Sequence, residues 1–364
     1  MWNLEWLRKW NRDNPTDIYG PAIIIGGAFG AVFFAALIVT WGWPAQTVSL
    51  QTGPAGNGMS VVSYLSAVEA GDPTIEDYYT EDAYPPEAGA QRASQIYENV
   101  QVLGDLTEDN FNRVMNAMTQ WVSPDQGCAY CHAGADEGEY ASDDLYTKVV
   151  SRRMIQMTQA LNEEWEGHVG PAGVNCYTCH RGQNVPSDIW FSIAPGLENV
   201  EGWSANQNLA TRQTVSTSLP HDALEKYLLE ENTIAVHDLE PRVDNEGTAS
   251  IQDTERTYSL MNYFSDSLGV NCVFCHNSRA FYDAAQVTPQ WATASLGITM
   301  VQELNNDWLV PLRDVYPENR LGPKHQDAPK AACKTCHKGY NQPLGGLDMI
   351  SDWPELATSG APRY

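Results

Sequence analysis

The sequence predicts a mainly α-helical chain with long irregular segments, two similar halves and one N-terminal membrane-spanning helix. Three observations lead to this fold class. Residues 18–68 contain no charged side chain and include a long apolar run. The segment Cys-x-x-Cys-His occurs four times and uses all eight cysteines. Helical patterns precede these segments, and the patterns of the first half of the chain recur in the second half.

The apolar run over residues 21–43 is long enough to span a bilayer. Tryptophans lie on both sides of it, as in the aromatic belts at the two surfaces of a membrane. A cleaved signal peptide is the competing interpretation, but the run is too long and no small-x-small cleavage site follows it. Arg8, Lys9 and Arg12 precede the run. They predict a cytoplasmic N-terminus and a single-pass protein of the inner membrane, with lipid around the anchor and the rest of the chain in the periplasm.

Each Cys-x-x-Cys-His segment has a spacing that suits the covalent attachment of haem. Two thiols on one helical turn can add to both vinyl groups, and the histidine that follows points at the iron. Two Cys₄ zinc sites are the alternative, but they do not need a histidine after every pair. The motifs therefore predict a multihaem c-type cytochrome with four covalently bound haem c groups, and they leave no thiol for a disulfide. The attachment cysteines are Cys128, Cys131, Cys176, Cys179, Cys272, Cys275, Cys333 and Cys336, and the proximal iron ligands are His132, His180, His276 and His337.

The formal net charge of the chain is −25. Its first 17 residues hold three acidic and three basic side chains, so the whole excess belongs to the predicted periplasmic part. Such a surface repels nucleic acid and attracts basic protein partners. Simple solubility is the plainer explanation, because an acidic surface also keeps a protein in solution.

The chain divides at the anchor and at the motifs. We expect an irregular segment after the anchor, beginning with a flexible glycine-rich stretch and lying over a partner or over the haem domain. Two motifs then come close together, and a long haem-free stretch separates them from the second two. The expected segments are a cytoplasmic N-terminus (1–20), the anchor (21–43), the irregular segment (44–90), the haem 1 and haem 2 repeat (91–184), a haem-free connecting segment (185–250), the haem 3 and haem 4 repeat (251–340) and a C-terminal tail (341–364).

The helical segments before the motifs form two related pairs. Residues 114–118 before the first motif resemble residues 260–264 before the third. Residues 157–165 before the second motif resemble residues 300–308 before the fourth. Haems one and two are thus repeated as haems three and four, which predicts a pseudo-twofold pair of dihaem repeats. Strand signals are weak throughout.

Local signals predict where these helices begin and end. Thr107 is a suitable cap for the helix before the first motif, and Ser142 for the helix before the second. Thr288 and Pro289 open the helix before the fourth motif. Pro311 is expected to close that helix, since proline lacks the N–H that a helix interior requires.

The sixth iron ligands must come from outside the motifs, where methionine and histidine are the usual choices. A methionine on an apolar helical face more often fills a core than binds a metal. In the first pair of helices Met115 aligns with Met261, whereas Met118 aligns with Phe264, which cannot bind iron. We therefore predict that Met115 and Met261 bind haems one and three.

The second pair of helices is ambiguous from the residues alone. Met157 aligns with Met300, and Met154 aligns with Gly297. Either Met157 and Met300 both bind iron, or Met154 binds haem two and haem four takes another kind of ligand.

A Met-bearing helix followed by Cys-x-x-Cys-His, repeated as two pairs behind a membrane anchor, resembles the tetrahaem cytochrome subunit of purple-bacterial photosynthetic reaction centres. The resemblance covers about residues 53–339. It implies three Met/His haems and a last, bis-histidine haem, whose extra histidine lies shortly before the second motif. That position is His168 here, although on the residues alone His325 competes equally. The resemblance thus implies Met154 for haem two and His168 for haem four, and leaves the other aligned methionines as core residues.

The resemblance also implies an electron-transfer subunit rather than an enzyme. It would take electrons from a soluble basic cytochrome c or high-potential iron–sulfur protein and pass them to the photo-oxidised bacteriochlorophyll special pair. The implied haem array runs in the order one, two, four, three, with the third nearest the special pair. Implied partners are the L and M subunits, with the H subunit and the light-harvesting antenna in the complex. Many relatives are tethered by a lipidated cysteine, whereas this chain keeps a membrane helix.

Two other classes fit parts of the pattern. A membrane-anchored tetrahaem quinol dehydrogenase has a similar anchor, but such proteins are much shorter and usually leave one haem open towards the quinol. A multihaem reductase needs a five-coordinate iron, whereas all four irons here have candidate sixth ligands. Another periplasmic multihaem electron shuttle is the remaining alternative.

The segment after the first motif is unusually acidic. Residues 132–144 contain five acidic and no basic side chains, whereas the next charged residue after each other motif is basic. Asp143 and Asp144 are best explained as stabilising the start of a helix after Ser142. The other three acids predict that a basic donor docks over haem one by electrostatic steering. These docking residues are Asp136, Glu137 and Glu139.

Overall fold

The computed structural model describes the chain in eight ranges, and over them it is mainly helical with one two-stranded sheet, as predicted. It contains two compact units, residues 1–48 with 62–69, and residues 49–61 with 70–364. The expected glycine-rich stretch after the anchor lies outside the described residues. Those residues are 5–15, 20–41, 45–51, 59–85, 87–193, 206–237, 249–281 and 283–360.

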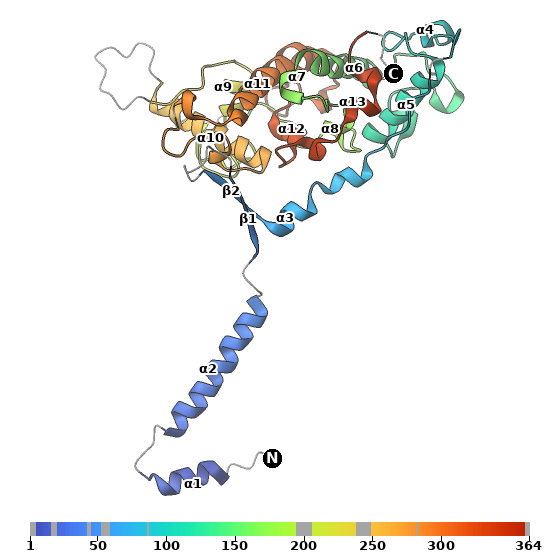
Figure 1. Ribbon diagram of the computed structural model, residues 1–364. Coiled ribbons are helices and arrows are strands. Elements are labelled where there is room, and N and C mark those ends of the chain that lie inside the picture. Colours follow the sequence, from blue (N-terminus) through green and yellow to red (C-terminus); the bar gives the residue numbers. More distant parts are fainter. Residues whose placement is uncertain are drawn as a thin grey trace, which may run out of the picture. The chain divides into compact units, whose positions relative to one another are not determined.

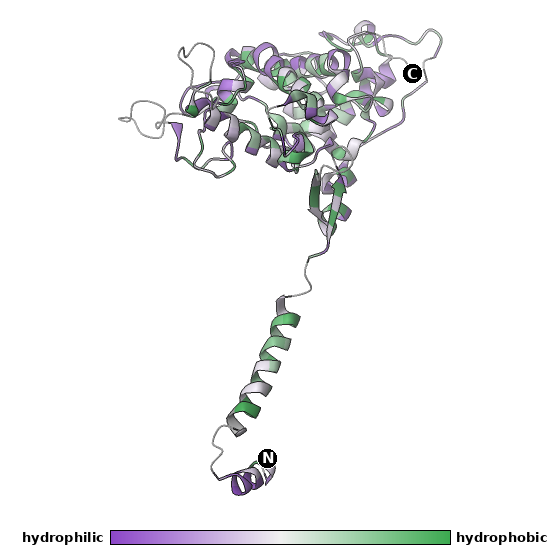
Figure 2. Cartoon of the chain, turned by 60° about the vertical axis from the view of Figure 1, so that its left-hand side comes forward, coloured by the Kyte–Doolittle hydropathy of each residue, from purple (hydrophilic) through white to green (hydrophobic). Residues whose placement is uncertain are grey.

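The N-terminal unit contains the helix α2 (Gly20–Trp41), preceded by the short helix α1 (Glu5–Asp13). Within α2, residues Ile23–Trp41 are long and apolar enough to cross a membrane. Figure 2 shows α2 as largely hydrophobic and α1 as largely hydrophilic. Most of the large apolar side chains of α2 are exposed, with 74% of Phe29 accessible. A helix that is apolar all round and unburied suits a lipid surrounding, in agreement with the predicted anchor.

The segment after the anchor is more regular than predicted. The strands β1 (Thr47–Gln51) and β2 (Ser60–Tyr64) form a two-stranded sheet, and α3 (Leu65–Ala70) follows β2 directly. Weak strand signals did not predict this sheet. A 3₁₀ turn then covers Pro73–Asp77, where the carboxylate of Asp72 accepts a hydrogen bond from the N–H of the second turn residue.

The second unit, residues 49–61 with 70–364, contains all four motifs and is the haem-motif unit. It is built from four long helices and several short ones. Figure 1 shows the short helices α8 and α12 side by side near its middle, with α5 and α10 at its two ends. The helices are α4 (Ala93–Ile96), α5 (Glu108–Val122), α6 (Tyr146–Glu164), α7 (Glu166–Val169), α8 (Cys176–His180), α9 (Ala223–Leu228), α10 (Ile251–Leu268), α11 (Pro289–Glu303), α12 (Cys333–His337) and α13 (Met349–Asp352). Short 3₁₀ turns cover Gly127–Tyr130, Ala135–Glu137, Cys272–Phe274, Ala284–Gln286, Val310–Asp314, Glu318–Arg320, Pro343–Gly346 and Pro354–Leu356, and a π-helical turn covers Leu304–Leu309.

Two of the predicted helix starts are confirmed and one is wrong. The Thr107 side chain caps α5 by accepting a hydrogen bond from a backbone N–H of its first turn. Pro289 opens α11, directly after Thr288. Helix α6, however, begins at Tyr146, so Ser142 does not cap it. The hydroxyl of Ser142 instead accepts a hydrogen bond from a backbone N–H two residues on, in a local turn that ends before the helix.

Pro311 does not end the helical path after α11, which corrects another expectation. The chain continues from α11 through the π-helical turn into the 3₁₀ turn Val310–Asp314. Pro311 stands in the first turn of that 3₁₀ segment, where the N–H that proline lacks has no helical partner to lose.

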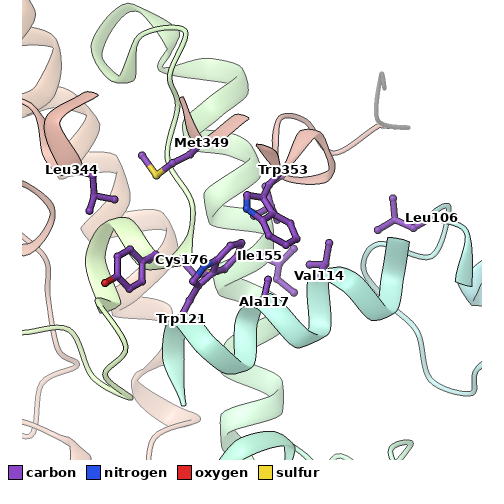
Figure 3. Close-up of a cluster of buried hydrophobic side chains, with 11 residues drawn as sticks. Leu106, Val114, Ala117, Trp121, Ile155, Cys176, Leu344, Met349 and Trp353 are labelled. Carbon is purple, nitrogen blue, oxygen red and sulfur yellow. The ribbon is translucent and has the colours of Figure 1, made fainter. Parts of the chain in front are cut away.

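Two hydrophobic cores hold this unit together. In the first, Trp121 of α5 meets Trp353 edge-to-face, with ring centres 4.7 Å apart, and Ile155 of α6 and Met349 of α13 pack beside them (Figure 3). The C-terminal segment therefore closes the core between α5 and α6. The second core joins α10 and α11 to α9, which belongs to the segment after the second motif. Its buried residues are Trp190, Ala223, Leu224, Tyr227, Leu228, Leu260, Tyr263, Val301 and Ala332.

A buried ion pair fastens the C-terminal segment to α5. The guanidinium of Arg113 donates to both carboxylate oxygens of Glu355, at 2.8 and 2.7 Å, and both side chains are fully buried. The same guanidinium lies over the ring of Trp353, 4.0 Å from its centre. Because removing one partner of such a pair leaves a buried charge, this contact fixes the position of the segment.

Candidate haem sites along one cavity

A cavity of about 1630 Å³ runs through the haem-motif unit. Residues of the first, second and fourth motifs line this cavity, and so does Cys275 of the third motif. Sites for a single drug-sized ligand are usually about 300–1,000 Å³, so this space suits several large cofactors. The cavity thus brings together motifs that are far apart in the sequence.

All four motif histidines are held in the same way. In each, the ring atom Nδ1 donates a hydrogen bond to the backbone carbonyl of a residue a few positions further on. This bond fixes the ring and its tautomer, and leaves Nε2 free of a proton for a metal. The pairs are His132 with Tyr140 at 3.0 Å, His180 with Gln183 at 2.8 Å, His276 with Phe281 at 2.9 Å, and His337 with Tyr340 at 2.9 Å.

Burial keeps three of the motif histidines in the form that binds iron. Loss of water lowers the pKa of His180 to about 4, and the pKa of His337 also to about 4. The pKa of His132 is lowered for the same reason. These imidazoles are therefore neutral near pH 7, as haem ligation requires.

The first and third motifs have one backbone form, and the second and fourth have another. The first and third begin as 3₁₀ turns, and a threonine at the start of the next helix holds each of them. Thr147 donates to the carbonyl of Tyr130, and Thr288 donates to that of Phe274. The second and fourth are the short helices α8 and α12, each followed by a residue in the left-handed region.

The second and fourth motifs are also anchored by matching asparagines. The side chain of Asn162 in α6 donates to the carbonyl of Val174 at 2.9 Å and accepts from its N–H at 2.8 Å. Asn305 forms the same two bonds with Ala331, at 3.0 and 2.9 Å. Both partners lie two residues before the first cysteine of a motif. Sequence analysis missed these residues, although both asparagines stand five residues after an aligned methionine.

Two further hydrogen bonds recur at corresponding places. The N–H of Gly182 donates to the carbonyl of Trp121, and the N–H of Gly339 donates to that of Ser267, both at 2.9 Å. The side chain of Gln159 in α6 donates to the carbonyl of Glu355 in the C-terminal segment. The side chain of Gln302 in α11 likewise donates to the carbonyl of Tyr227 in α9.

Two of the methionines predicted as ligands line the cavity. Met115 comes from α5 and Met154 from α6, and the carbonyl of each accepts a hydrogen bond from a threonine four residues later. Met261 of α10 is partly buried against the second core and is not among the residues that line the cavity. Burial and position alone do not separate ligands from packing residues, because four other methionines also line the cavity. These are Met118, Met157, Met300 and Met349.

His168 on α7 faces His337 across a gap. The two ring centres are 6.1 Å apart, and the ring planes are inclined by 69°. Two imidazoles that bind one metal from opposite sides have ring centres about 6 Å apart, since each metal–nitrogen bond is about 2 Å and each ring centre lies about 1 Å further on. Nδ1 of His168 donates to the carbonyl of Thr293 at 2.9 Å, as in the motif histidines. His325 is exposed and does not line the cavity.

Gly297 of α11 makes room for His168. A Cβ atom at this position would lie 2.8 Å from Nδ1 and 3.0 Å from Nε2 of that histidine. Real Cβ atoms do not come this close to a ring, so a larger residue would displace the histidine. The glycine that aligns with Met154 is therefore the position where a side chain from another element enters the cavity.

Cys179 and Cys336 lie in bonding contact, with Cα atoms 4.5 Å apart. For this pair the structure contradicts the expectation that no thiol is left for a disulfide. Each thiol forms only one such covalent bond, so a disulfide here and two thioether bonds to haem exclude each other. The backbone positions of Cys179 and Cys336 place the second cysteines of the second and fourth motifs next to each other.

The three predicted docking acids lie on one exposed loop. Asp136 and Glu137 belong to the 3₁₀ turn Ala135–Glu137, and Glu139 follows the left-handed Gly138. All three side chains are exposed. The loop follows His132 directly, so these carboxylates lie at the first motif.

Asp143 has a different role from the one predicted. Its carboxylate forms ion pairs with Arg152 at 2.8 Å and with Lys148 at 3.3 Å. Hydrogen bonds from Arg152 hold the pKa of this carboxyl well below its usual range. Since α6 begins at Tyr146, Asp143 ties the loop to the side of the helix rather than stabilising its start.

Comparison with known proteins decides the family. The family model for the photosynthetic reaction centre cytochrome C subunit matches residues 42–357. The chain belongs to this family. It is 63% identical to the photosynthetic reaction center cytochrome c subunit of Roseobacter denitrificans, over 99% of both chains. It is 43% identical to the protein of the same name from Rubrivivax gelatinosus, over 74% of this chain and 73% of the relative.

A third member, from Thermochromatium tepidum, is 44% identical over 73% of this chain and 64% of its own length. As a reaction-centre cytochrome c subunit the chain carries covalent haem c and functions in photosynthetic electron transport. The residues of the cavity fit this cofactor, since they supply paired thiols and neutral imidazoles with free Nε2 atoms. The apolar helix α2 fits membrane anchoring.

Proposed function

We propose that this chain takes electrons from a soluble periplasmic donor and delivers them to the photo-oxidised special pair of a photosynthetic reaction centre. The observation that carries the proposal is a single cavity reached by all four Cys-x-x-Cys-His motifs, in a member of the reaction-centre cytochrome family. When bound, four haem c groups supply one-electron iron couples. The protein's own part is to hold them, exclude water and set their potentials, and no bond-making chemistry is required of it.

The placement of the side chains supports part of the proposed set of iron ligands. The motif histidines provide one ligand each, supported by their Nδ1 bonds to carbonyls. The 6.1 Å spacing of the His168 and His337 rings supports a bis-histidine fourth haem, and the Met154 and Met115 positions in the cavity support methionine at haems two and one. The full set is His132 and Met115, His180 and Met154, His276 and Met261, and His337 and His168.

The chain is also proposed to be a pair of dihaem repeats. Matching bonds from Asn162 and Asn305, and from Thr147 and Thr288, support this pairing. The array order one, two, four, three is supported by two observations. The cavity takes in the first, second and fourth motifs and reaches only one cysteine of the third. The second and fourth motifs touch through their second cysteines.

The proposed topology puts the N-terminus in the cytoplasm and the haem-motif unit in the periplasm. Three basic side chains before α2 support it. The L and M subunits of the reaction centre, with the H subunit and the antenna in the complex, are the proposed membrane partners. Protease added outside spheroplasts should remove the haem-motif unit and leave α1 protected. Loss of α1 instead would reverse the topology.

The donor is proposed to dock over the first motif through the acidic loop. Asp136, Glu137 and Glu139 are exposed, and none of them forms an ion pair within the described ranges. Charge reversal at all three should slow re-reduction by a basic cytochrome c at low ionic strength, because steering acts on the association rate and weakens with salt. Electron transfer within the complex should not change.

A matched control separates steering from the general charge of the surface. Glu231, Asp314 and Asp348 are exposed acids on other segments, and their reversal alters the net charge by the same amount. This control should leave the low-salt rate nearly unchanged. Equal slowing in both triple variants would mean that net charge, not the loop, attracts the donor. An unaltered rate in the loop variant would put docking elsewhere, or indicate a donor that binds by apolar contact.

A flash experiment on native membranes tests the proposed function as a whole. After a flash that oxidises the special pair, the haems of this chain should be oxidised and then re-reduced by the soluble donor. Absence of flash-induced haem oxidation would overturn the proposal. Carbon monoxide provides a second check, because prompt binding at one reduced haem would indicate an open iron site and favour a quinol dehydrogenase or a reductase.

A further inference from the structure

The carbonyl oxygen of Tyr140 accepts two hydrogen bonds at once. One comes from Nδ1 of His132 at 3.0 Å and the other from Nζ of Lys148 at 2.7 Å. The same ammonium group also donates to the carbonyls of Ala141 and Ser142, both at 2.8 Å. Lys148 is buried, with 7% of its surface exposed, so a desolvated cation lies against the group that orients the first motif histidine.

The other three motif histidines lack this second donor. The carbonyls of Gln183, Phe281 and Tyr340 bind their histidines at 2.8, 2.9 and 2.9 Å. Across the described part of the chain, none of these three carbonyls accepts a hydrogen bond from a lysine or an arginine. The bond from His132 is also the longest of the four, at 3.0 Å. The first motif therefore differs from the others in the atoms just behind its iron ligand.

A charged donor on this carbonyl weakens its bond to the imidazole. An ammonium group is a stronger donor than a neutral N–H, and it draws the electron density of the shared oxygen towards itself. A hydrogen bond from Nδ1–H makes a metal-bound imidazole more basic, so a weaker bond makes it less basic. A less basic imidazole donates less electron density to the iron, so the ferric state loses more stabilisation than the ferrous state. The midpoint potential of the haem therefore rises.

We propose that Lys148 is a positioning residue that raises the midpoint potential of haem one by competing with His132 for the carbonyl of Tyr140. This inference rests on the proposed function, in which His132 binds that haem. Haems one, two and three share the same proposed pair of ligands, histidine and methionine. The inference therefore assigns a difference in the potential of haem one to the contact of Lys148 with the carbonyl that orients His132.

The positive charge of Lys148 has an effect of its own, and Arg152 provides the control for it. Arg152 lies one turn further along α6 and also pairs with Asp143, at 2.8 Å. It does not donate to Tyr140; its bonds go to Asp143 and to the carbonyl of Asn99. Arg152→Gln therefore removes one positive charge from the same region without changing the shared carbonyl.

The experiment is a redox titration of the four haems in the purified complex. A Met115→His variant identifies haem one, because replacement of its methionine lowers that potential. Lys148→Met should shift the reduction equilibrium of haem one about threefold to tenfold towards the oxidised form, where tenfold corresponds to about 59 mV for one electron. Lys148→Arg should retain the native potential, Arg152→Gln should shift it less, and the other three haems should not respond.

The outcomes are distinguishable. An unchanged haem one in Lys148→Met, or equal shifts in Lys148→Met and Arg152→Gln, would overturn the inference and leave the proposed function intact. If Met115→His shifted no haem, the proposed ligands themselves would be wrong. If Lys148→Met failed to assemble haem one, Lys148→Gln, which keeps a neutral donor to the loop, takes its place and should give a shift of the same sign. No shift in that variant would also overturn the inference.

Discussion

Helices α6 and α11 lead to the second and fourth motifs in the same way, yet they differ at one decisive position. Asn162 of α6 and Asn305 of α11 form the same reciprocal bonds just before the two motifs. At the aligned position towards the cavity, α6 carries Met154 whereas α11 carries Gly297, which lies against the ring of His168. One helix thus presents a side chain to the cavity, and the other gives up its side chain to admit one from α7.

Under the proposed ligation, this difference gives two similar helices sites of different potential. The asparagine anchors and the Nδ1 bonds recur in both places, although Asn162 lies in a regular helix and Asn305 in a π-helical turn. At the aligned position α6 has methionine and α11 has glycine, and the axial ligands proposed for the two sites differ accordingly. Axial ligand identity is a strong determinant of haem potential. Substitutions at and around these positions test whether that single exchange separates the fourth site from the second.

The largest effect is expected from His168→Met. A methionine in place of this histidine should raise the potential of haem four by on the order of 0.1 V, within the roughly 0.8 V that axial ligands span. Redox titration of the purified complex measures the shift. A change at haem two instead would reverse the assignment of the two sites.

Gly297→Ala should have the next largest effect. Its Cβ would meet the ring of His168 at less than 3 Å, so the histidine should lose its position opposite His337. Haem four should then become open to carbon monoxide, which difference spectra of the reduced protein detect. Gly30→Ala is the control, because a Cβ there meets nothing within 4 Å. Carbon monoxide binding in both variants, or in neither, would contradict the steric role of Gly297.

Asn162→Ala and Asn305→Ala should each lower stability, and by similar amounts. Each change removes the partner of a backbone N–H before a motif and of a carbonyl elsewhere, that of Leu356 for Asn162 and that of Leu228 for Asn305. The carbonyl of Ala331 keeps a bond from the indole N–H of Trp190. Each unpaired buried group costs about 1–3 kcal/mol. Thermal unfolding of the holoprotein, followed by haem absorbance, should give two lowered midpoints. If only one variant unfolds earlier, the two anchors are not equivalent and the resemblance of the halves is superficial here.

The smallest effect is expected from Met157→Leu and Met300→Leu. Both residues line the cavity but are proposed as packing residues, and such volume-conserving exchanges usually cost less than about 1.5 kcal/mol. The near-infrared absorption of Met-ligated ferric haem should keep its full intensity. Loss of one third of that band in either variant would identify a ligand among the residues assigned to packing.

Much of this arrangement follows from local signals in the sequence. The thiol spacing, the apolar run and the Thr107 cap depend on neighbouring residues, so they were readable without a structure. The predictions that Ser142 caps a helix and that Pro311 ends one were wrong. Long-range packing and the choice between helix types decide where these helices begin and end. The Gly297 position signalled a missing ligand, but only the fold brings it against His168. The sheet after the anchor and the Lys148 contact gave no comparable signal.

Each hydrophobic core is completed by a segment from another part of the chain, and for the first core this has a consequence for biosynthesis. The core between α5 and α6 is completed by the C-terminal segment through Trp353 and the buried pair of Arg113 and Glu355. In the proposed periplasmic topology, a chain translocated from its N-terminal end presents the first two motifs long before that segment emerges. The thiols of those motifs are therefore accessible to a haem-attachment machinery while the first half is still open. Arrival of the last residues then seals the attached cofactors inside.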